Sequence, residues 1–317
     1  MTYLARTREG SEEISISFLK KHSATKISSP QPGVILFTNK TIPEHSTFQY
    51  VYEFIKEIKT LEEAKKIDYS KIKAPFRVKC RKKKGGDLST LDIERDLGEH
   101  IHETHSKEVN LTKPKTTVIV EMIKDKIYIC QTAEDKKISQ KEYRVKTNPN
   151  SLTADLANTL LIAIDYKPSQ AILDPFCGTG EILIEASLQK GKKIYGLDSN
   201  EFNIKKAKFN AKVAGVKLDL SKADVDWLDT KFKEGEINHI VTSLPTPNKF
   251  LKSRDILTNY KDLFNQAKFI LKKTGTLTLI TTKPQLLEEI PLEGFKEDKK
   301  YIISSGDVKH TLIIYKK

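Results

Sequence analysis

The sequence predicts an α/β protein in which a doubly wound parallel sheet follows a smaller α+β part. Three observations support this fold class. From residue 151 onward, short apolar strands alternate with amphipathic helices, which is the pattern of βαβ units. Before residue 133 there is no such alternation, and a polar, charged stretch at 133–150 separates the two patterns as a linker. The length of 317 residues suits two or three domains of about 100–200 residues each.

The composition indicates a globular protein with a basic surface. Hydrophobic residues make up 38% of the chain, which excludes wholesale disorder, and no apolar run approaches the roughly 18–20 residues that span a bilayer. The three cysteines are far apart and the N-terminal residues lack an apolar signal core, so we expect a cytoplasmic protein with no metal site and no membrane partner. The formal net charge of +13 favours a nucleic-acid partner, although a lysine-rich composition alone would also produce it.

Local signals predict the elements of the N-terminal part. Apolar alternation marks the strands, and Ser89 or Thr90 is a helix-capping residue with Glu94 near the helix start. In chain order we expect a strand at 3–5, a helix at 12–20, a strand ending at 34–37, a helix at 49–58, a strand at 76–80, a helix from 89 or 90 to 105, and strands at 117–122 and 126–130.

The C-terminal part reads as alternating helices and strands. We expect helices at 151–166, 180–190, 201–215 and 258–272, strands at 171–174, 193–197, 218–222, 238–242 and 275–281, and a final antiparallel pair at 300–304 and 309–315.

The strongest motif lies where the first of these strands meets its helix. The strand ends in Asp174, and Gly178 and Gly180 follow in a short turn where backbone can approach a ligand closely. The crevice beyond such strand ends is where open α/β sheets bind nucleotide-like ligands. A phosphate-binding loop would need a lysine or a longer glycine spacing, whereas a carboxylate suits the ammonium of S-adenosylmethionine. The alternative is a purely structural strand–helix turn.

Acidic residues also end the next two strands. Asp198 follows the glycine turn by about 20 residues, where a carboxylate can accept both ribose hydroxyls. Asp224 could accept from an adenine amino group while Val225 packs on the ring. Each acid alone could be a surface or capping residue, but together they form a constellation at successive strand ends of one sheet, which favours a ligand site there.

With these motifs, residues 151–317 resemble the Rossmann-type S-adenosylmethionine-dependent methyltransferases that modify exocyclic amino groups in RNA. The lead-in Asn148-Pro149-Asn150-Ser151-Leu152 is similar to the segment that also touches the cofactor in that family. The resemblance implies S-adenosylmethionine as cofactor, held by Ser151, Leu152, Asp174, Pro175, Phe176, Cys177, Gly178, Thr179, Gly180, Asp198, Ser199, Asp224 and Val225.

The front of the chain is similar to a THUMP RNA-binding domain preceded by a ferredoxin-like segment. The similarity lies in residues 3–5, 12–14, 76–81, 92–98 and 109–111. It implies a ferredoxin-like segment at 1–46, a THUMP domain at 47–132, a linker at 133–150 and a methyltransferase domain at 151–317. Residues 210–216 resemble the tRNA guanine-N2 methyltransferases that act at position 6, and the position-10 enzymes carry a similar glycine turn.

The segment expected to act on the amine departs from that family. In that family the fourth strand ends in a four-residue motif: Asn or Asp, then Pro or Leu, then Pro, then an aromatic residue. The Asn or Asp side chain and a backbone carbonyl of the proline loop accept the two N–H bonds of the amine. The aromatic side chain stacks on the target base, which is flipped out of its helix. Here Ser243, Leu244 and Pro245 stand in the first three places, and Thr246 cannot stack. Three readings stay open: Asn248, Phe250 or Tyr260 substitutes; another atom or RNA is modified; or the chain is a non-catalytic tRNA-binding paralogue.

A basic stripe is the expected RNA contact. Arg77, Lys79 and Arg81 alternate along one strand and so share a face, and Lys82, Lys83 and Lys84 extend it into the turn. The resemblance implies that this stripe holds the 3′ end of a tRNA, and the alternative is a solvated turn that protects a sheet edge. We expect a monomer or a homodimer.

Overall fold

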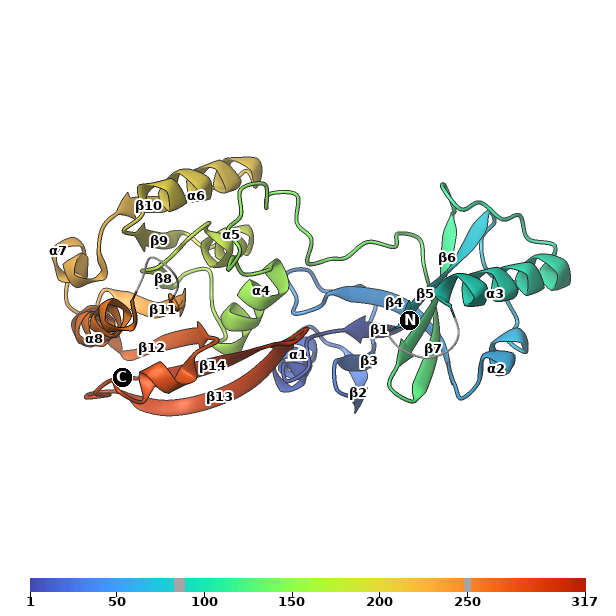
Figure 1. Ribbon diagram of the computed structural model, residues 1–317, viewed down its shortest axis with the longest axis horizontal. Coiled ribbons are helices and arrows are strands. Elements are labelled where there is room, and N and C mark those ends of the chain that lie inside the picture. Colours follow the sequence, from blue (N-terminus) through green and yellow to red (C-terminus); the bar gives the residue numbers. More distant parts are fainter. Residues whose placement is uncertain (83–88, 248–251) are drawn as a thin grey trace. The chain divides into compact units, whose positions relative to one another are not determined.

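The computed structural model describes residues 1–82, 89–247 and 252–317 and divides into two compact units (Figure 1). The α+β unit comprises Met1–Arg6, Ser23–Ile42 and Tyr50–Lys137. The Rossmann unit comprises Thr7–His22, Pro43–Gln49 and Ile138–Lys317. The residues that we expected to form one N-terminal segment, 1–46, are therefore shared between the two units.

The α+β unit is built on a seven-stranded sheet in the described residues. Its strands pair antiparallel, except for one parallel pair at the edge, β5 with β6. Across the sheet they run β2 (Thr25–Gln31), β3 (Val34–Thr38), β1 (Thr2–Arg6), β4 (Tyr50–Ile58), β7 (Lys126–Thr132), β6 (Thr116–Ile123) and β5 (Phe76–Lys82). The helices are α2 (Leu61–Lys65) and α3 (Thr90–His105).

The helix that we predicted at 49–58 is wrong, because these residues form strand β4 between β1 and β7. The segment is rich in aromatic and β-branched residues, which favour a strand. Its register against β7 shifts between Phe54 and Lys56, and such an irregularity interrupts the two-residue alternation of a strand. The apolar residues Val51, Ile55 and Ile58 then follow at helix-like spacing, which explains the error.

Helix α3 matches its prediction. The Ser89 hydroxyl accepts a hydrogen bond from the Leu91 N–H at 3.2 Å, as expected of an N-cap. Its buried face carries Ile93, Leu97 and Ile101, which pack in one cluster with the apolar face of β5 and β6. The predicted strands at 117–122 and 126–130 are confirmed as the antiparallel pair β6 and β7.

The Rossmann unit contains a second seven-stranded sheet in the described residues, parallel except for its last two strands. Across it run β10 (Asp219–Lys222), β9 (Lys193–Asp198), β8 (Ala171–Asp174), β11 (Ile237–Ser243), β12 (Leu271–Thr281), β14 (Val308–Lys316) and β13 (Lys296–Ser305). The helical elements are α1 (Glu12–Lys21), α4 (Ala154–Ala163), α5 (Glu181–Leu188), α6 (Glu201–Val213), η1 (Val225–Trp227), α7 (Leu228–Lys231), α8 (Ser253–Ile270) and η2 (Pro284–Leu287).

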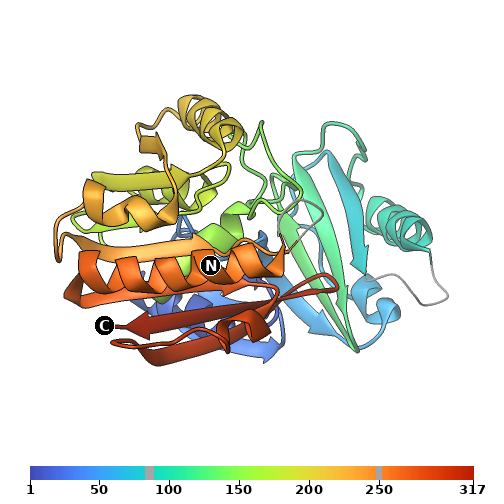
Figure 2. The ribbon, with the colours of Figure 1, turned by 60° about the vertical axis from the view of Figure 1, so that its left-hand side comes forward.

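Alternate residues of the central strands face two different cores, so this sheet is covered on both sides (Figure 2). Leu173, Ile240 and Leu279 pack with α8 on one face. Ile172 and Val241 pack on the other face with α4, α5 and Ile14 of α1. Strand order reverses between β8 and β11, which is the point where open α/β sheets bind ligands. Among the described residues, no helix combines the length and apolar character needed to cross a membrane.

Candidate active site

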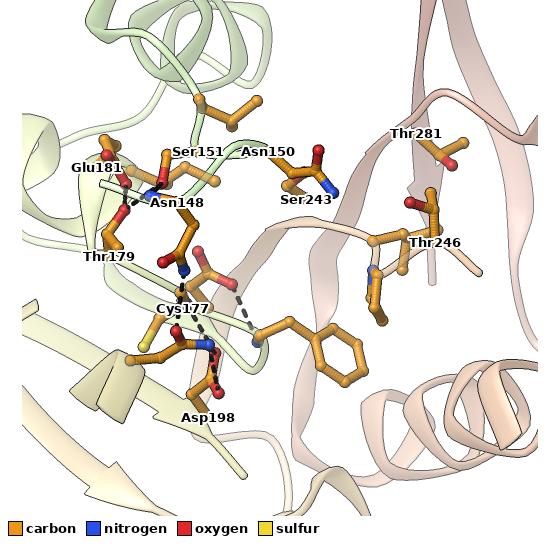
Figure 3. A pocket seen from close by; sticks show the side chains of 18 of the residues that line it. Asn148, Asn150, Ser151, Cys177, Thr179, Glu181, Asp198, Ser243, Thr246 and Thr281 are labelled. Atoms are coloured by element: carbon orange, nitrogen blue, oxygen red, sulfur yellow. Dashed lines mark hydrogen bonds between the residues drawn. The ribbon is translucent and has the colours of Figure 1, made fainter. Parts of the chain in front are cut away.

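A pocket of about 540 Å³ lies at the carboxyl ends of β8, β9 and β11, wholly within the Rossmann unit (Figure 3). It brings together nearly all of the predicted cofactor and amine residues. Its lining includes Ser151, Leu152, Asp174, Pro175, Phe176, Cys177, Gly178, Thr179, Asp198, Ser199, Asp224, Val225, Ser243, Leu244 and Pro245.

Gly180 is the one predicted residue of the glycine turn that is not part of this lining. It has φ +90° and precedes α5, and an added Cβ would lie 3.2 Å from the Ala207 Cβ. Gly178 also has positive φ, at +53°. The left-handed backbone of both positions favours glycine, and at Gly180 the close approach of Ala207 adds a steric reason.

The turn is fastened to the end of β9. The Cys177 N–H donates to the Leu197 carbonyl at 2.8 Å, and the Gly178 N–H donates to Asp198 Oδ2 at 2.9 Å. Burial raises the pKa of the Cys177 thiol well above its ordinary value, so the side chain is a packed neutral thiol rather than a nucleophile.

Asp174, at the end of β8, places a carboxyl group in the lining of the pocket. Its side chain is buried, and Oδ1 accepts hydrogen bonds from the Thr242 hydroxyl at 2.6 Å and from the Phe176 N–H at 3.1 Å. Burial raises the pKa of Asp174 to about 7, because desolvation outweighs these two hydrogen bonds to the charged form. A cation beside Asp174 would restore its ionised form.

Asp198 is held by donors that the sequence analysis did not single out. Oδ1 accepts from the Asn200 N–H at 2.9 Å, and Asn203 Nδ2 lies 3.0 and 3.1 Å from the two carboxylate oxygens. Asn203 Oδ1 in turn accepts from Asn148 Nδ2 at 2.9 Å. Asn203 lies in the first turn of α6, the helix that follows Asp198. This position in the sequence could have identified Asn203 as a donor to the Asp198 carboxylate.

The lead-in segment closes one side of the pocket. Asn148 and Ser151 bond to each other: the Ser151 N–H donates to the Asn148 carbonyl at 3.0 Å, and the Asn148 N–H donates to Ser151 Oγ at 2.8 Å. Ser151 Oγ also lies 2.7 Å from Thr179 Oγ1, so the lead-in touches the glycine turn directly. Asn150 lies between Asn148 and Ser151 in the chain, and its carboxamide points into the pocket (Figure 3).

At the end of β11 the backbone is tightly held. The Leu244 N–H donates to the Ile280 carbonyl at 2.9 Å, and the Tyr260 hydroxyl donates to the Pro245 carbonyl at 2.6 Å. Tyr260 is fully buried, so the hypothesis that it stacks on a base is wrong: it anchors the segment instead. Asn248 and Phe250, the other proposed substitutes, lie outside the described residues.

Further polar residues line the pocket that the sequence analysis did not identify. They come from α8, from the end of β12 and from the β13–β14 hairpin, which lie far from the glycine turn in sequence, so no local motif marks them. They are Asn259, Thr281, Thr282, Ser305 and His310.

The predicted basic stripe lies on β5 of the α+β unit. Three of its residues, Arg77, Lys79 and Arg81, have an acidic partner. Arg77 and Arg81 both pair with Asp135, and Arg81 also lies over the Tyr50 ring at 4.6 Å from its centroid. Lys79 Nζ lies 3.1 Å from Glu94. Lys82 ends the strand, while Lys83 and Lys84 lie outside the described residues. The stripe is therefore less positive than its sequence indicates.

Within residues 1–82, 89–247 and 252–317, no group of three or more His, Cys, Asp or Glu is arranged to hold a metal ion. The polar lining of the pocket consists mainly of amides, hydroxyls and separate carboxylates.

Comparison with known proteins identifies both parts of the chain. The profile described as "RMKL-like, methyltransferase domain" matches residues 141–311, and that of the THUMP domain matches residues 52–131. A Methanocaldococcus jannaschii protein named tRNA (guanine(6)-N2)-methyltransferase is 26% identical over 268 residues, covering 69% of this chain and 70% of that protein. A Methanothermobacter thermautotrophicus protein named tRNA (guanine(10)-N2)-dimethyltransferase is 30% identical over 248 residues, 75% of this chain and 72% of that one.

The fold is also shared with a solved structure. TrmN from Thermus thermophilus superposes with a TM-score of 0.79 at 22% identity, covering 100% of both chains. This likeness confirms the predicted fold class over the whole length. The chain belongs to the family of RMKL-like methyltransferase domains and carries a THUMP domain ahead of that domain.

Proposed function

We propose that this protein transfers a methyl group from S-adenosylmethionine to the N2 amine of a guanine in tRNA. The observation that carries the proposal is the pocket at the topological switch point, where Asp174, Asp198 and Asp224 from three strand ends meet the glycine turn. The two relatives named above are tRNA guanine-N2 methyltransferases, which supports the substrate class. Position 6 is our preferred target and position 10 is the alternative. A tRNA substrate favours the cytoplasm as the location.

The residues of the pocket fit the cofactor group by group. Asp174 is a buried carboxyl whose Oδ2 is left for an ammonium, because its described hydrogen bonds both fall on Oδ1. The turn from Pro175 to Gly180 would hold the methionine end and Asp198 the ribose, with Ser199, Ser151 and Leu152 beside them. Asp224 and Val225 would hold the adenine. When bound, the cofactor supplies an electrophilic methyl group.

The amine would be held at the end of β11. A guanine N2 lone pair is delocalised into the ring, so acceptors for its two N–H bonds help to offset the positive charge that develops on it. Ser243 Oγ and the carbonyls of Leu244 and Pro245 are such acceptors. The Pro245 carbonyl already accepts from Tyr260, which orients it and leaves one lone pair free. Asn150 adds a carboxamide oxygen to the same pocket, and it is our candidate for the acceptor that Ser243 supplies only weakly.

The first experiment is a methyl-transfer assay with the full chain, labelled S-adenosylmethionine and bulk tRNA. We expect label in N2-methylguanosine after digestion of the RNA. Transcripts with inosine in place of guanine at position 6 or 10 lack the exocyclic amine, so loss of transfer from one of them identifies the position. Asp198→Ala should abolish cofactor binding and transfer together while tRNA binding persists.

The non-catalytic reading gives a different result in the same assay. A protein that binds tRNA but neither binds S-adenosylmethionine nor transfers a methyl group would be an RNA-binding paralogue, and the altered segment from Ser243 to Thr246 would mark the lost activity.

A further inference from the structure

Neither matched profile covers the loop between β1 and α1, although this loop is part of the Rossmann unit. It packs closely on β13: the Ser304 N–H donates to the Glu9 carbonyl at 2.9 Å. Gly10 has φ +91°, and a Cβ added there would lie 1.8 Å from the Ile302 carbonyl oxygen. Only glycine allows this approach, so the position of the loop on β13 is closely defined.

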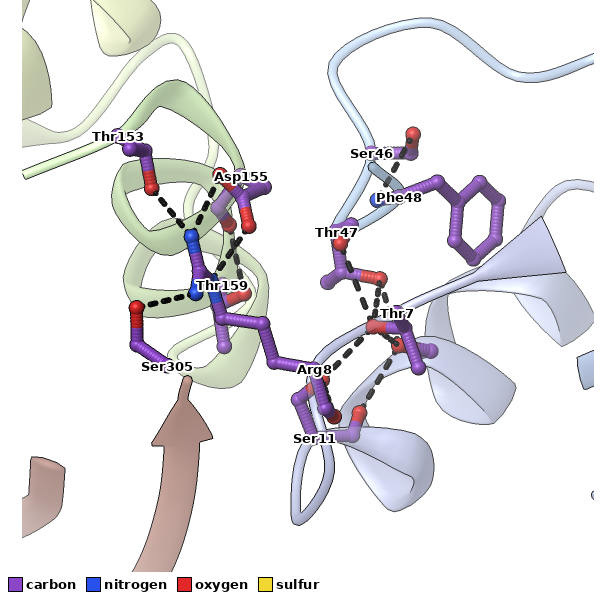
Figure 4. Close-up of polar contacts among 11 residues, drawn as sticks. Thr7, Arg8, Ser11, Ser46, Thr47, Phe48, Thr153, Asp155, Thr159 and Ser305 are labelled. Carbon is purple, nitrogen blue, oxygen red and sulfur yellow. Dashed lines mark hydrogen bonds and ion pairs between the residues drawn. The ribbon is translucent and has the colours of Figure 1, made fainter. Parts of the chain in front are cut away.

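Arg8 extends from this loop into a buried polar cluster (Figure 4). Its side chain is 8% exposed and that of Asp155 is 0% exposed. Arg8 Nε lies 2.6 Å from Asp155 Oδ2, and Nη2 lies 3.5 Å from Oδ1. The guanidinium thus uses two of its nitrogens on one carboxylate, which fixes the plane of the group.

The remaining donors of Arg8 reach two residues of the pocket lining. Nη2 donates to Thr153 Oγ1 at 2.9 Å, and Nη1 donates to Ser305 Oγ. Thr153 is the N-cap residue of α4, yet its hydroxyl makes no capping hydrogen bond. Ser305 ends β13 at the turn into β14. One side chain therefore joins the N-cap of α4, directly after the lead-in segment, to the β13–β14 hairpin, and both Thr153 and Ser305 line the pocket.

We propose that Arg8 is a positioning residue of the cofactor pocket, holding Thr153 and Ser305 at the spacing that ligand binding requires. The inference rests on the proposed function. A buried ion pair contributes little net stability, since the desolvation of both charges offsets their attraction. The planar fork of arginine, by contrast, fixes several acceptors at once, which a lysine ammonium cannot do. The main contribution of Arg8 is therefore to fix the positions of its acceptors, rather than to raise the stability of the fold.

The test replaces both charges in the full chain, as Arg8→Met with Asp155→Leu. Apolar side chains of similar volume commonly preserve the stability of a buried ion pair, so we expect Tm to stay close to that of the unaltered protein. The dissociation constant and KM for S-adenosylmethionine should rise about tenfold or more, because Thr153 and Ser305 are no longer tied, while kcat at saturating cofactor stays nearly unchanged. A purely structural pair would not produce this split between KM and kcat.

Two further variants complete the test. Arg8→Lys keeps the positive charge beside Asp155 but loses the planar guanidinium group. This variant should fold and still show a raised KM for S-adenosylmethionine. It therefore tests the proposal even if the double variant does not fold. The control replaces the exposed pair Lys316–Asp298 on the same hairpin by Met and Leu and should change neither constant. Unchanged cofactor affinity in a folded double variant or in Arg8→Lys overturns the proposal. If the unaltered protein binds no S-adenosylmethionine, the proposed function fails and this assignment with it.

Discussion

At the scale of single residues, Asp174 is a buried carboxyl group for which we propose contact with the ammonium of the cofactor. The pKa of Asp174 is raised to about 7 by desolvation, so below that pH the carboxyl is protonated and neutral. A neutral carboxyl no longer attracts an ammonium. We therefore expect the dissociation constant for S-adenosylmethionine to rise by up to about tenfold per pH unit as pH falls from 7 toward 5. Calorimetric titration across this range measures it.

Two variants identify Asp174 as the source of that pH dependence. Asp174→Asn should bind weakly at every pH between 5 and 7. Thr242→Val removes a hydrogen bond that favours the ionised carboxylate, so the pKa rises further and the midpoint moves to higher pH. A pH-independent affinity in the unaltered protein would show that Asp174 does not contact the ammonium.

At the scale of elements, strand β5 carries the proposed RNA stripe, but acidic neighbours compensate part of its charge. Asp135, whose side chain is 5% exposed, serves both Arg77 and Arg81, whereas Lys79 is 41% exposed beside Glu94. Among Arg77, Lys79 and Arg81, Lys79 is thus the residue most open to a phosphate. Each phosphate contact contributes roughly 0.7–0.9 to the slope of log K against log salt.

We expect Lys79→Ala to reduce the salt slope of tRNA binding by about that amount and to weaken binding evenly across tRNA species. Filter binding at several salt concentrations gives the slope. Lys124→Ala, at the exposed turn between β6 and β7 of the same unit, is the matched control and should leave the slope unchanged. Equal slopes for all three proteins would favour the alternative reading, a solvated edge strand.

At the scale of the whole molecule, the Rossmann unit is discontinuous in sequence. Two N-terminal segments belong to it, Thr7–His22 and Pro43–Gln49. The first supplies Ile14 to the core and Arg8 to the ion pair with Asp155. The second supplies His45, whose Nδ1 lies 3.5 Å from Glu185 Oε2. A fragment from Ile138 onward loses all of these. An unpaired buried carboxylate alone costs about 3–5 kcal/mol, which is a large part of the stability of a domain.

We expect the fragment 138–317 to lack a cooperative thermal transition and to bind no S-adenosylmethionine. The control is the full chain with a protease site between Lys137 and Ile138, cleaved after folding, which retains the N-terminal segments. That cleaved protein should keep its transition and its cofactor affinity. Calorimetry of both preparations decides the matter, and a fragment that unfolds cooperatively and binds as tightly as the full chain would refute the prediction.

The sequence by itself determined the features that depend on neighbouring residues. The strand–turn–helix around Asp174 and Gly180, the alternation of the C-terminal part and the Ser89 cap were predictable, because turn chemistry and side-chain period are local properties. The same reasoning brought Asp198 and Asp224 to one sheet edge. Tertiary structure alone decided the irregular register of β4 against β7, the place of Thr7–His22 in the Rossmann unit, and the contacts of Arg8 with Thr153 and Ser305. These depend on pairing and burial between segments distant in the chain, which no local pattern encodes.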